Sequence, residues 1–360
     1  MTRLHLAVAL DGAGWHPAAW RERGARPTEL LSLPYWTELV TEAERGLLDF
    51  VTFEDALGLQ SAAPFWPDER TDQVRGRLDA VVLAAGIAPH TSRIGLVPTT
   101  NVTLTEPLHT ASGIASLSYA SQGRAGWRPQ VAARAADAAH VGRRNIPALA
   151  AEDVAAGSER IAAVLAELYA EAADVIDTVK RLWGDWENDR PLITVLAHAT
   201  TPYRLAATGA DIVYVTPHSR ADAVRILEEV RAAADTVGRP PQEVLKTFAD
   251  LVVFLDDRPG IAAHRKMRLD ELDGAELASD AAIFTGTPGE LADLILDWAE
   301  AGLDGFRLRP GVLSHDLTAI STGLVLELQR RGAFRTTYEA GTLRELLGLS
   351  RTAGHSMDRA

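Results

Sequence analysis

Residues that can bind or react stand just behind a series of short apolar runs in this sequence. If those runs are parallel strands, their carboxyl ends meet at one face, where barrel enzymes keep their chemistry. Each residue type also serves as an ordinary loop contact, but together they predict a polar mouth with aromatic side chains, suited to a planar cofactor. The set comprises Asp11, Trp15, His16, Glu54, Asp55, Thr99, Thr100, Asn101, Trp127, Arg128, His198, Thr200, Thr201, Thr216, His218 and Arg309.

The run from Gly123 to Trp127 is the most unusual of these segments. Its glycines, Gly123 and Gly126, flank Arg124-Ala125, and an indole follows at once. Glycine allows a backbone to approach another group closely. The run therefore predicts a strand that passes near something and then presents Trp127 at the mouth of a barrel.

Two other chemistries are disfavoured by spacing. His16, His198 and His218 come from separate runs without supporting carboxylates, so no metal site is expected. Glu54 and Asp55 are adjacent on a strand, and their side chains must diverge. A paired-carboxylate acid/base device is therefore not expected there.

The surrounding elements alternate between strands and helices. The apolar runs are nearly continuous, as in parallel strands covered on both sides. We expect strands at Leu4–Leu10, Phe50–Glu54, Ile94–Thr99, Ala125–Trp127, Leu192–Ala197, Ile212–Thr216, Leu245–Leu255 and Phe306–Arg309. Amphipathic patterns predict helices at Tyr35–Arg45, Ala80–Ala88, Glu106–Tyr119, Ile161–Trp183, Ala221–Val237 and Glu290–Ala301.

A repeated junction supports one barrel. Helices end at a glycine, an aspartate follows within three residues, and a buried strand begins; the pairs are Gly46/Asp49, Gly209/Asp211 and Gly302/Asp304. Glycine ends a helix, and aspartate turns the chain with its own hydrogen bonds. The fold class is therefore α/β, a (β/α)8 TIM barrel with loop insertions and a C-terminal helical tail. An open doubly wound sheet is the alternative, although Asp11–Trp15 lacks a dinucleotide-binding fingerprint.

Composition excludes several classes of function. The chain has 360 residues, 47% of them hydrophobic, no cysteine and a net charge of −13. Such a charge argues against binding to nucleic acid. No apolar stretch is long enough for a membrane span, and no signal peptide is visible, so we expect a cytoplasmic protein. Long loops are expected at Ser61 to Gly76 and at Pro129 to Ser158.

Four stretches of the chain resemble the luciferase-like flavin-dependent monooxygenases, nearest the branch that contains nitrilotriacetate monooxygenase. They span most of the chain, and the tail is the most specific. The stretches are Tyr35 to Asp55, Arg93 to Trp127, Ala170 to Trp186, and Leu328 to Glu345.

The resemblance implies a barrel that binds reduced FMN supplied by a separate flavin reductase. Oxygen would add to the flavin, and the flavin hydroperoxide would oxygenate a small organic substrate. In this reading Trp15, His16 and Trp127 are the catalytic candidates. The cofactor-binding candidates are Asp55, Thr99, Thr100, Arg128, Tyr169, Ala197, His198, Ala199 and Thr200. Two alternatives remain: a reduced-deazaflavin-dependent oxidoreductase on the same barrel, and a barrel without catalysis that binds flavin or a partner.

Several positions depart from the family pattern. After Trp127 the family has Asn-Val-Val-Thr-Ser, whereas this chain reads Arg128 to Ala132. The family's Gly-Ala-Ser phosphate loop is replaced by Ala197 to Thr201, and a segment before the fifth strand is almost absent. Arg128, Thr200 and Thr201 are the candidates to replace the lost phosphate donors.

The expected domain organisation is a single barrel domain over residues 1–350, with a flexible tail over residues 351–360. We also expect a homodimer, because barrel helices and the extended tail Leu328–Leu349 offer surface for a second copy. Trp298 and Phe334 are candidate contacts, with core packing as the alternative for each.

Overall fold

The structure is a computed structural model that describes residues 4–61, 65–142, 144–149, 152, 157–184 and 190–349. Its strands include all eight expected from the sequence, with small differences at their ends, and one that was not expected, β8. They are β1 (His5–Leu10), β2 (Phe50–Phe53), β3 (Gly95–Asn101), β4 (Gly126–Gln130), β5 (Leu192–Leu196), β6 (Ile212–Val215), β7 (Lys246–Leu255), β8 (Ala282–Gly286) and β9 (Gly305–Pro310).

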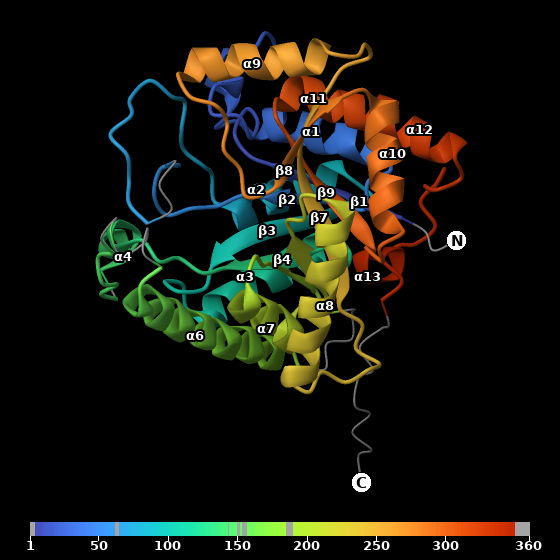
Figure 1. Cartoon of the computed structure of the whole chain (residues 1–360). Coiled ribbons are helices and arrows are strands. Elements are labelled where there is room, and N and C mark those ends of the chain that lie inside the picture. The colour runs from blue at the N-terminus through green and yellow to red at the C-terminus, as the bar shows by residue number, and fades with distance from the viewer. Residues whose placement is uncertain are drawn as a thin grey trace.

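The strands close into a barrel (Figure 1). β1 pairs in parallel with β2 and with β9, and the pairing runs from β2 through β7 back to β9. The (β/α)8 TIM barrel is therefore confirmed, and the doubly wound alternative is wrong. The unexpected β8 pairs only with Leu251–Leu255 of β7. Sequence missed it because four of its five residues are only half-buried, so it has no buried apolar run.

Helices surround the barrel, and α9 and α11 lie together at one end of the view in Figure 1. A π-helical turn at Ile320–Leu324 joins α11 to α12. The helices are α1 (Leu33–Arg45), α2 (Ala80–Ile87), α3 (Pro107–Ala120), α4 (Ala135–Val141), α6 (Glu159–Trp183), α7 (Thr200–Gly209), α8 (Arg220–Thr236), α9 (Ile261–Asp273), α10 (Pro288–Ala299), α11 (Leu313–Ala319), α12 (Val325–Arg330) and α13 (Leu343–Leu346). Short 3-10 turns lie at Ala19–Arg21, Pro27–Glu29 and Ala88–His90.

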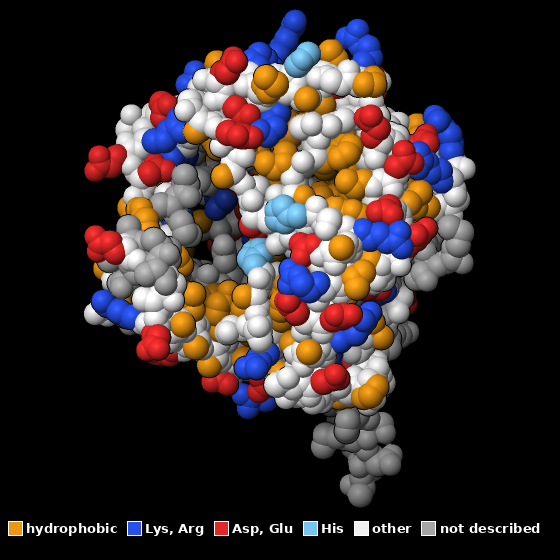
Figure 2. Space-filling view, in the orientation of Figure 1, with side chains coloured by type: hydrophobic (Ala, Val, Ile, Leu, Met, Phe, Trp, Pro, Cys, Tyr) orange, Lys and Arg blue, Asp and Glu red, His pale blue; other side chains and the backbone are white. Residues whose placement is uncertain are grey.

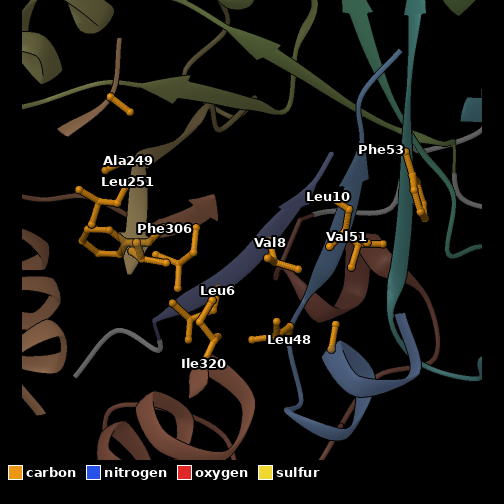
Figure 3. Packing of buried hydrophobic residues seen from close by; sticks show 14 of the residues in the cluster. Leu6, Val8, Leu10, Leu48, Val51, Phe53, Ala249, Leu251, Phe306 and Ile320 are labelled. Carbon is orange, nitrogen blue, oxygen red and sulfur yellow. The ribbon is translucent and has the colours of Figure 1, made fainter. Parts of the chain in front are cut away.

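Side chains alternate along each strand between the helix layer and the barrel interior. Leu6, Val8 and Leu10 of β1 pack in one cluster with helical residues such as Ile320 (Figure 3). Ala7 belongs instead to a separate cluster with Phe50, Val97, Ile212 and Phe248. We call it the lower interior cluster, because it lies toward the N-terminal face of the barrel. The alternation decides which candidate residues share a compartment.

The glycine–aspartate junctions have a common structural role. The carboxylate of Asp49 accepts the backbone N–H of Leu6 at 2.7 Å. Asp211 accepts that of Ile193 at 2.9 Å, and Asp304 accepts that of Thr247 at 2.9 Å. Each aspartate therefore binds the start of the neighbouring strand, which fixes the strand register at the N-terminal face.

The C-terminal segment seals that same face. Leu343 and Leu347 are fully buried in the lower interior cluster. Arg335 donates to Asp49 at 2.5 Å, and an oxygen of Asp211 lies 3.0 Å from Arg344. The tail therefore belongs to the barrel core, and its arginines engage two of the junction aspartates.

Some expectations need correction. The segment from Pro129 to Ser158 is not one long loop, because β4 extends to Gln130 and α4 follows. Trp298 and Phe334 are each 6% exposed and pack in the core. Trp186 and the tail 351–360 lie outside the described residues. No helix in the described part of the chain is both long and apolar enough to cross a bilayer.

Candidate active site

The candidate residues fall into separate compartments at the carboxyl ends of the strands. Odd and even positions of a strand face opposite sides of the barrel wall, so neighbours in sequence are parted. Figure 2 shows the molecule hollowed on one side, with a basic side chain in the depth and histidine side chains near the rim.

One compartment is an outer pocket of about 270 Å³ beyond the barrel wall. Asp55 and Thr100 line it, beside Asn101 and Gln130 from the ends of β3 and β4. The α2 segment and α3 supply Asp79, Val81, Val82, His109, Thr110 and Gly113, and loop residues Ala56, Leu57 and Thr105 complete the lining. Two predicted cofactor residues, Asp55 and Thr100, therefore share one pocket.

The outer pocket holds a carboxyl group whose pKa is raised. Burial raises the pKa of Asp55 to about 6, although the backbone N–H groups of Ala80 and Ala56 oppose the shift. Thr110 is 3% exposed, and its hydroxyl has no hydrogen-bond partner among the residues that the structure describes. Buried polar groups normally have partners, so this hydroxyl is an exception in the wall of the pocket.

A second compartment is a charged network inside the upper barrel. Asp250 of β7 accepts from Arg307 Nε at 2.8 Å and from Arg309 Nε at 2.9 Å. Arg307 also lies 3.7 Å from Glu54 and stacks over the ring of Tyr214 at 4.0 Å. We call Glu54, Arg128, Asp250, Arg307 and Arg309 the inner network.

Electrostatics keep this network ionised. Burial opposes the charge on Asp250, but Arg307 and Arg309 outweigh it and hold the pKa of Asp250 below its usual range. Burial likewise opposes the charge on Glu54, and Arg128 and Arg307 hold its pKa low. Isolated buried charges are costly, so each member depends on its partners.

Arg128 belongs to the inner network, and Thr99 lies at its edge. Arg128 is 3% exposed; its Nε donates to Thr99 at 2.9 Å, and its terminal nitrogen donates to Glu54. The conjecture that Arg128 replaces a lost phosphate donor therefore needs correction, because its guanidinium is already engaged in the barrel. Glu54 and Asp55 diverge as expected, into the inner network and the outer pocket.

Trp127 faces the helix layer, not the mouth. It is fully buried, donates its Nε1–H to Thr100 at 2.7 Å, and meets Trp183 edge-on at 5.9 Å. Gly126 faces inward, where an added Cβ would lie 2.7 Å from Val97. The close approach expected for this run is therefore real, but it is to the barrel interior.

A third compartment, the tryptophan pocket, has a volume of about 520 Å³. It lies between the β1 loop with Trp15, His16 and Trp20, the segment around Arg70 and Arg75, and the segment after α9. Gly14, with φ +146°, lets the β1 loop approach the end of β9, where an added Cβ would lie 2.3 Å from the Gly311 oxygen. Trp15 N then donates to Pro310 O at 2.9 Å.

His16 lines this pocket with both ring nitrogens engaged. Its Nδ1 accepts the backbone N–H of Ala18 at 3.0 Å, so Nε2 carries the proton and donates to Asp270 at 3.0 Å. Burial lowers the pKa of His16, although Asp270 opposes the shift. The imidazole therefore links the β1 loop to α9 as a neutral ring.

The other predicted phosphate ligands lie on α6 and at the start of α7. His198, Ala199 and Thr200 are exposed, and Ala197 is buried, its N–H bound to Tyr214 O at 2.9 Å. Tyr169 on α6 is half-buried and packs against the core. The first turn of α7 has no side-chain cap, which leaves backbone donors available.

His198 is joined to the inner network through Asp280. His198 Nε2 lies 3.4 Å from Asp280, and Arg309 donates to Asp280 at 2.6 Å. Burial opposes ionisation of Asp280, but Arg309 lowers its pKa to about 2. Sequence reasoning missed Asp250, Asp280 and Arg307; the available signal was charged residues inside otherwise apolar strands, at Asp250 and Arg307.

Comparison with known proteins places the chain among oxygenases. The model of the family described as "Luciferase-like monooxygenase" matches residues 15–265. N-acetyl-S-(2-succino)cysteine monooxygenase of Bacillus subtilis (strain 168) is 25% identical, with 97% of each chain covered. Nitrilotriacetate monooxygenase component A of Aminobacter aminovorans is 26% identical, again with 97% of each covered.

A solved structure agrees on the fold. EDTA monooxygenase from Chelativorans sp. BNC1 superposes with a TM-score of 0.78 at 21% identity, covering 97% of this chain and 99% of that one. The alignment with the Bacillus protein is 454 positions long, against 360 residues in this chain. The relative therefore has residues at positions where this chain has none.

Proposed function

Since the chain belongs to the luciferase-like monooxygenase family, we propose that it is a monooxygenase that uses reduced FMN and molecular oxygen to oxygenate a small organic substrate. The observation that carries the proposal is the outer pocket, in which Asp55 and Thr100 share a wall with an unpartnered Thr110 hydroxyl. Apolar walls with few convergent polar groups are typical of cofactor sites.

The residues of the outer pocket fit the ring of a flavin. A flavin ring has two apolar faces and one edge of alternating donors and acceptors. Val81 and Val82 offer apolar contact, and Thr100, Thr110 and Asn101 offer polar atoms. Asp55, with its pKa of about 6, can donate a proton as an acid or accept one as a carboxylate. We propose that these residues hold the polar edge of the ring.

The phosphate is assigned to the start of α7. Backbone N–H groups at a helix N-terminus favour an anion. Thr200 and Thr201 belong to this first turn, and His198 stands just before it. Tyr169 remains a predicted contact from α6.

Reduced flavin supplies the electrons that activate molecular oxygen when it is bound. The chain's own contribution is orientation and exclusion of water. The inner network places buried, paired charges below the mouth, and preorganised charges of this kind can stabilise charge that develops in a reaction. His16 holds the β1 loop to α9 and so positions Trp15 beside the tryptophan pocket.

The proposal includes two partners. The name of the Aminobacter relative includes "component A", which describes that protein as one part of a larger system. We propose that a separate flavin reductase supplies reduced FMN to this chain. A homodimer and a cytoplasmic location are further parts of the proposal.

An anaerobic titration with reduced FMN tests the cofactor. Saturable binding, followed by reductase-dependent oxygen consumption that a substrate stimulates, is the expected result. A parallel titration with reduced deazaflavin tests the alternative cofactor. If neither binds, the proposal is wrong and the barrel has another role.

A further inference from the structure

One wall of the tryptophan pocket comes from a segment without regular structure. β2 ends at Phe53 and α2 begins at Ala80. Arg70, Gln73 and Arg75, from the chain between them, line the pocket. Loops longer than about 12–15 residues without helices or strands are uncommon in compact domains, and active-site lids are one class that has them. We call residues 65–77 the wall segment.

The barrel core does not hold the wall segment in place. Each of its residues is half-buried or exposed, whereas all four residues of β2 are buried. No backbone–backbone hydrogen bond joins residues 65–77 to any residue that the structure describes. Segments with few buried contacts and few backbone hydrogen bonds open at low free energy. The wall segment can therefore move while the barrel stays folded.

Ion pairs keep the wall segment in one shape and fix its base. Within the segment, Arg75 binds both oxygens of Asp68, at 2.6 and 2.9 Å. At its end, Arg77 binds both oxygens of Asp11 in the β1 loop, at 2.8 and 2.6 Å. Such bidentate pairs are among the stronger polar contacts. The segment is therefore expected to move as a unit about Arg77.

On the other side of the pocket, Asp273 joins the wall segment to α9. Asp273 is the last residue of α9, and its carboxylate accepts from Arg70 at 3.0 Å and from Gln73 at 2.9 Å. Its carbonyl oxygen accepts a second Arg70 nitrogen at 3.0 Å. The β1 loop adds one long contact, from Arg21 to the Asp72 carbonyl oxygen at 3.5 Å.

The position of Asp273 shows what its charge contributes. A carboxylate at the C-terminus of a helix is disfavoured by the helix dipole, so α9 gains no stability from it. The side chain is nevertheless 9% exposed and bound by Arg70 and Gln73. The favourable contacts of this carboxylate are therefore those it makes to the wall segment.

We propose that the wall segment is a lid over the tryptophan pocket, which turns about its base at Arg77 and is latched to α9 by Asp273. With the latch closed, the lid shields Trp15 and His16 from water. With the latch open, small molecules reach the pocket. Lids that exclude water suit oxygenase chemistry, but the latch does not depend on the proposed function.

A single thiol inside the pocket tests access to it. The chain has no cysteine, so Ala13→Cys would carry the only thiol, on the pocket wall at a side chain that is 6% exposed. We expect Asp273→Ala to speed its reaction with iodoacetamide about five- to tenfold, because the reaction follows the open fraction. Ala233→Cys, 4% exposed on α8, should react equally slowly with or without Asp273→Ala. No acceleration at Ala13→Cys, or equal acceleration at both thiols, overturns the proposal.

A matched variant separates the latch from general loosening of the surface. Asp297 also stands in the last turn of a helix, α10, and pairs with an arginine of another helix, Arg220, at 2.8 Å. Asp297→Ala should leave the reaction of Ala13→Cys unchanged. An acceleration as large as that from Asp273→Ala would overturn the latch.

Limited digestion with trypsin gives an independent measurement. Trypsin cleaves after arginine, and Arg70, Arg75 and Arg77 lie in the lid. Asp273→Ala should speed the first cleavage at these sites about five- to tenfold. First cleavage inside another described helix or strand would show that the variant loosens the whole barrel, and would overturn the proposal.

Both measurements use the chain without flavin, which separates the lid from the proposed function. Flavin binding without any lid response overturns the lid alone. A lid response in a chain that binds no flavin overturns the oxygenase and leaves the lid standing.

Discussion

Arg307 donates its Nε–H to Asp250 at 2.8 Å while both side chains are fully buried inside the barrel. The two residues come from neighbouring strands, β9 and β7, and face the same interior layer. Arg309, two residues further along β9, shares the same carboxylate at 2.9 Å. A single aspartate thus pairs with two arginines, while Asp280 and Glu54 supply further negative charge to Arg309 and Arg307.

Replacing that aspartate should be severely destabilising. Asp250→Asn would leave Arg307 and Arg309 without their shared anion, and breaking a buried pair by removing one partner costs about 3–5 kcal/mol. Urea unfolding followed by circular dichroism measures the loss. Asp293→Asn, whose partner Arg331 sits on the surface, should cost about 1 kcal/mol or less. Equal losses in both variants would show that the buried charges are not mutually dependent.

Thr110→Val should separate stability from cofactor binding. The hydroxyl has no partner in the described part of the chain, so an apolar methyl in its place should leave the free energy of unfolding unchanged or slightly higher. If the hydroxyl binds the flavin, affinity for reduced FMN should fall about five- to tenfold, equivalent to about 1–1.4 kcal/mol. The control is Thr236→Val on exposed α8. Unchanged flavin affinity in Thr110→Val would remove this residue from the cofactor site.

Asp55 should make the protein less stable as pH rises. Its pKa is raised in the fold to about 6, so the folded state favours the protonated form. The stabilisation relative to Asp55→Asn is complete below the unfolded pKa of about 4 and is lost as pH rises through about 6. We expect a relative loss of about 3 kcal/mol between these limits, measured by urea unfolding across pH.

Asp280 should change the stability in the opposite direction with pH, which makes it a comparison for Asp55. Its pKa is lowered in the fold to about 2, so its stabilisation relative to Asp280→Asn is present above about pH 4 and is lost as pH falls through about 2. The two variants should therefore show pH trends of opposite direction. The same trend in both would mean that global charge, not local environment, controls stability.

Leu347→Ala should show how far the tail supports the barrel. Leu347 is fully buried in the lower interior cluster, and a buried Leu→Ala change costs about 2–5 kcal/mol. Leu326→Ala on α12, where the side chain is 48% exposed, should cost about 1 kcal/mol or less. Thermal unfolding of the two variants makes the comparison; a mild effect at Leu347 would contradict a sealing role.

Sequence patterns predicted the barrel well because it rests on local signals. Apolar runs located the eight closing strands, and the repeated glycine and aspartate at Gly46 and Asp49 marked the junctions. Those aspartates were expected to bind their own turns. They bind the neighbouring strand instead, which is visible only once the strands are paired.

The candidate site was harder to predict because it depends on which side of the wall a residue faces. Trp127 and Arg128 are adjacent, yet one packs against Trp183 and the other enters the inner network. The partners of Arg307 lie on β2 and β7, far away in sequence and joined only by closure of the barrel. The identity of a single residue does not predict which distant residue it will pair with.

The sealing of the barrel by its last residues has a consequence for synthesis. Arg335, Arg344 and Leu347 complete the face where the first strand begins. A nascent chain cannot close this face until residues near position 349 have left the ribosome. Shorter nascent chains lack the residues that cover the lower interior cluster. Genes truncated near their 3′ end should therefore yield chains that depend on chaperones and are degraded.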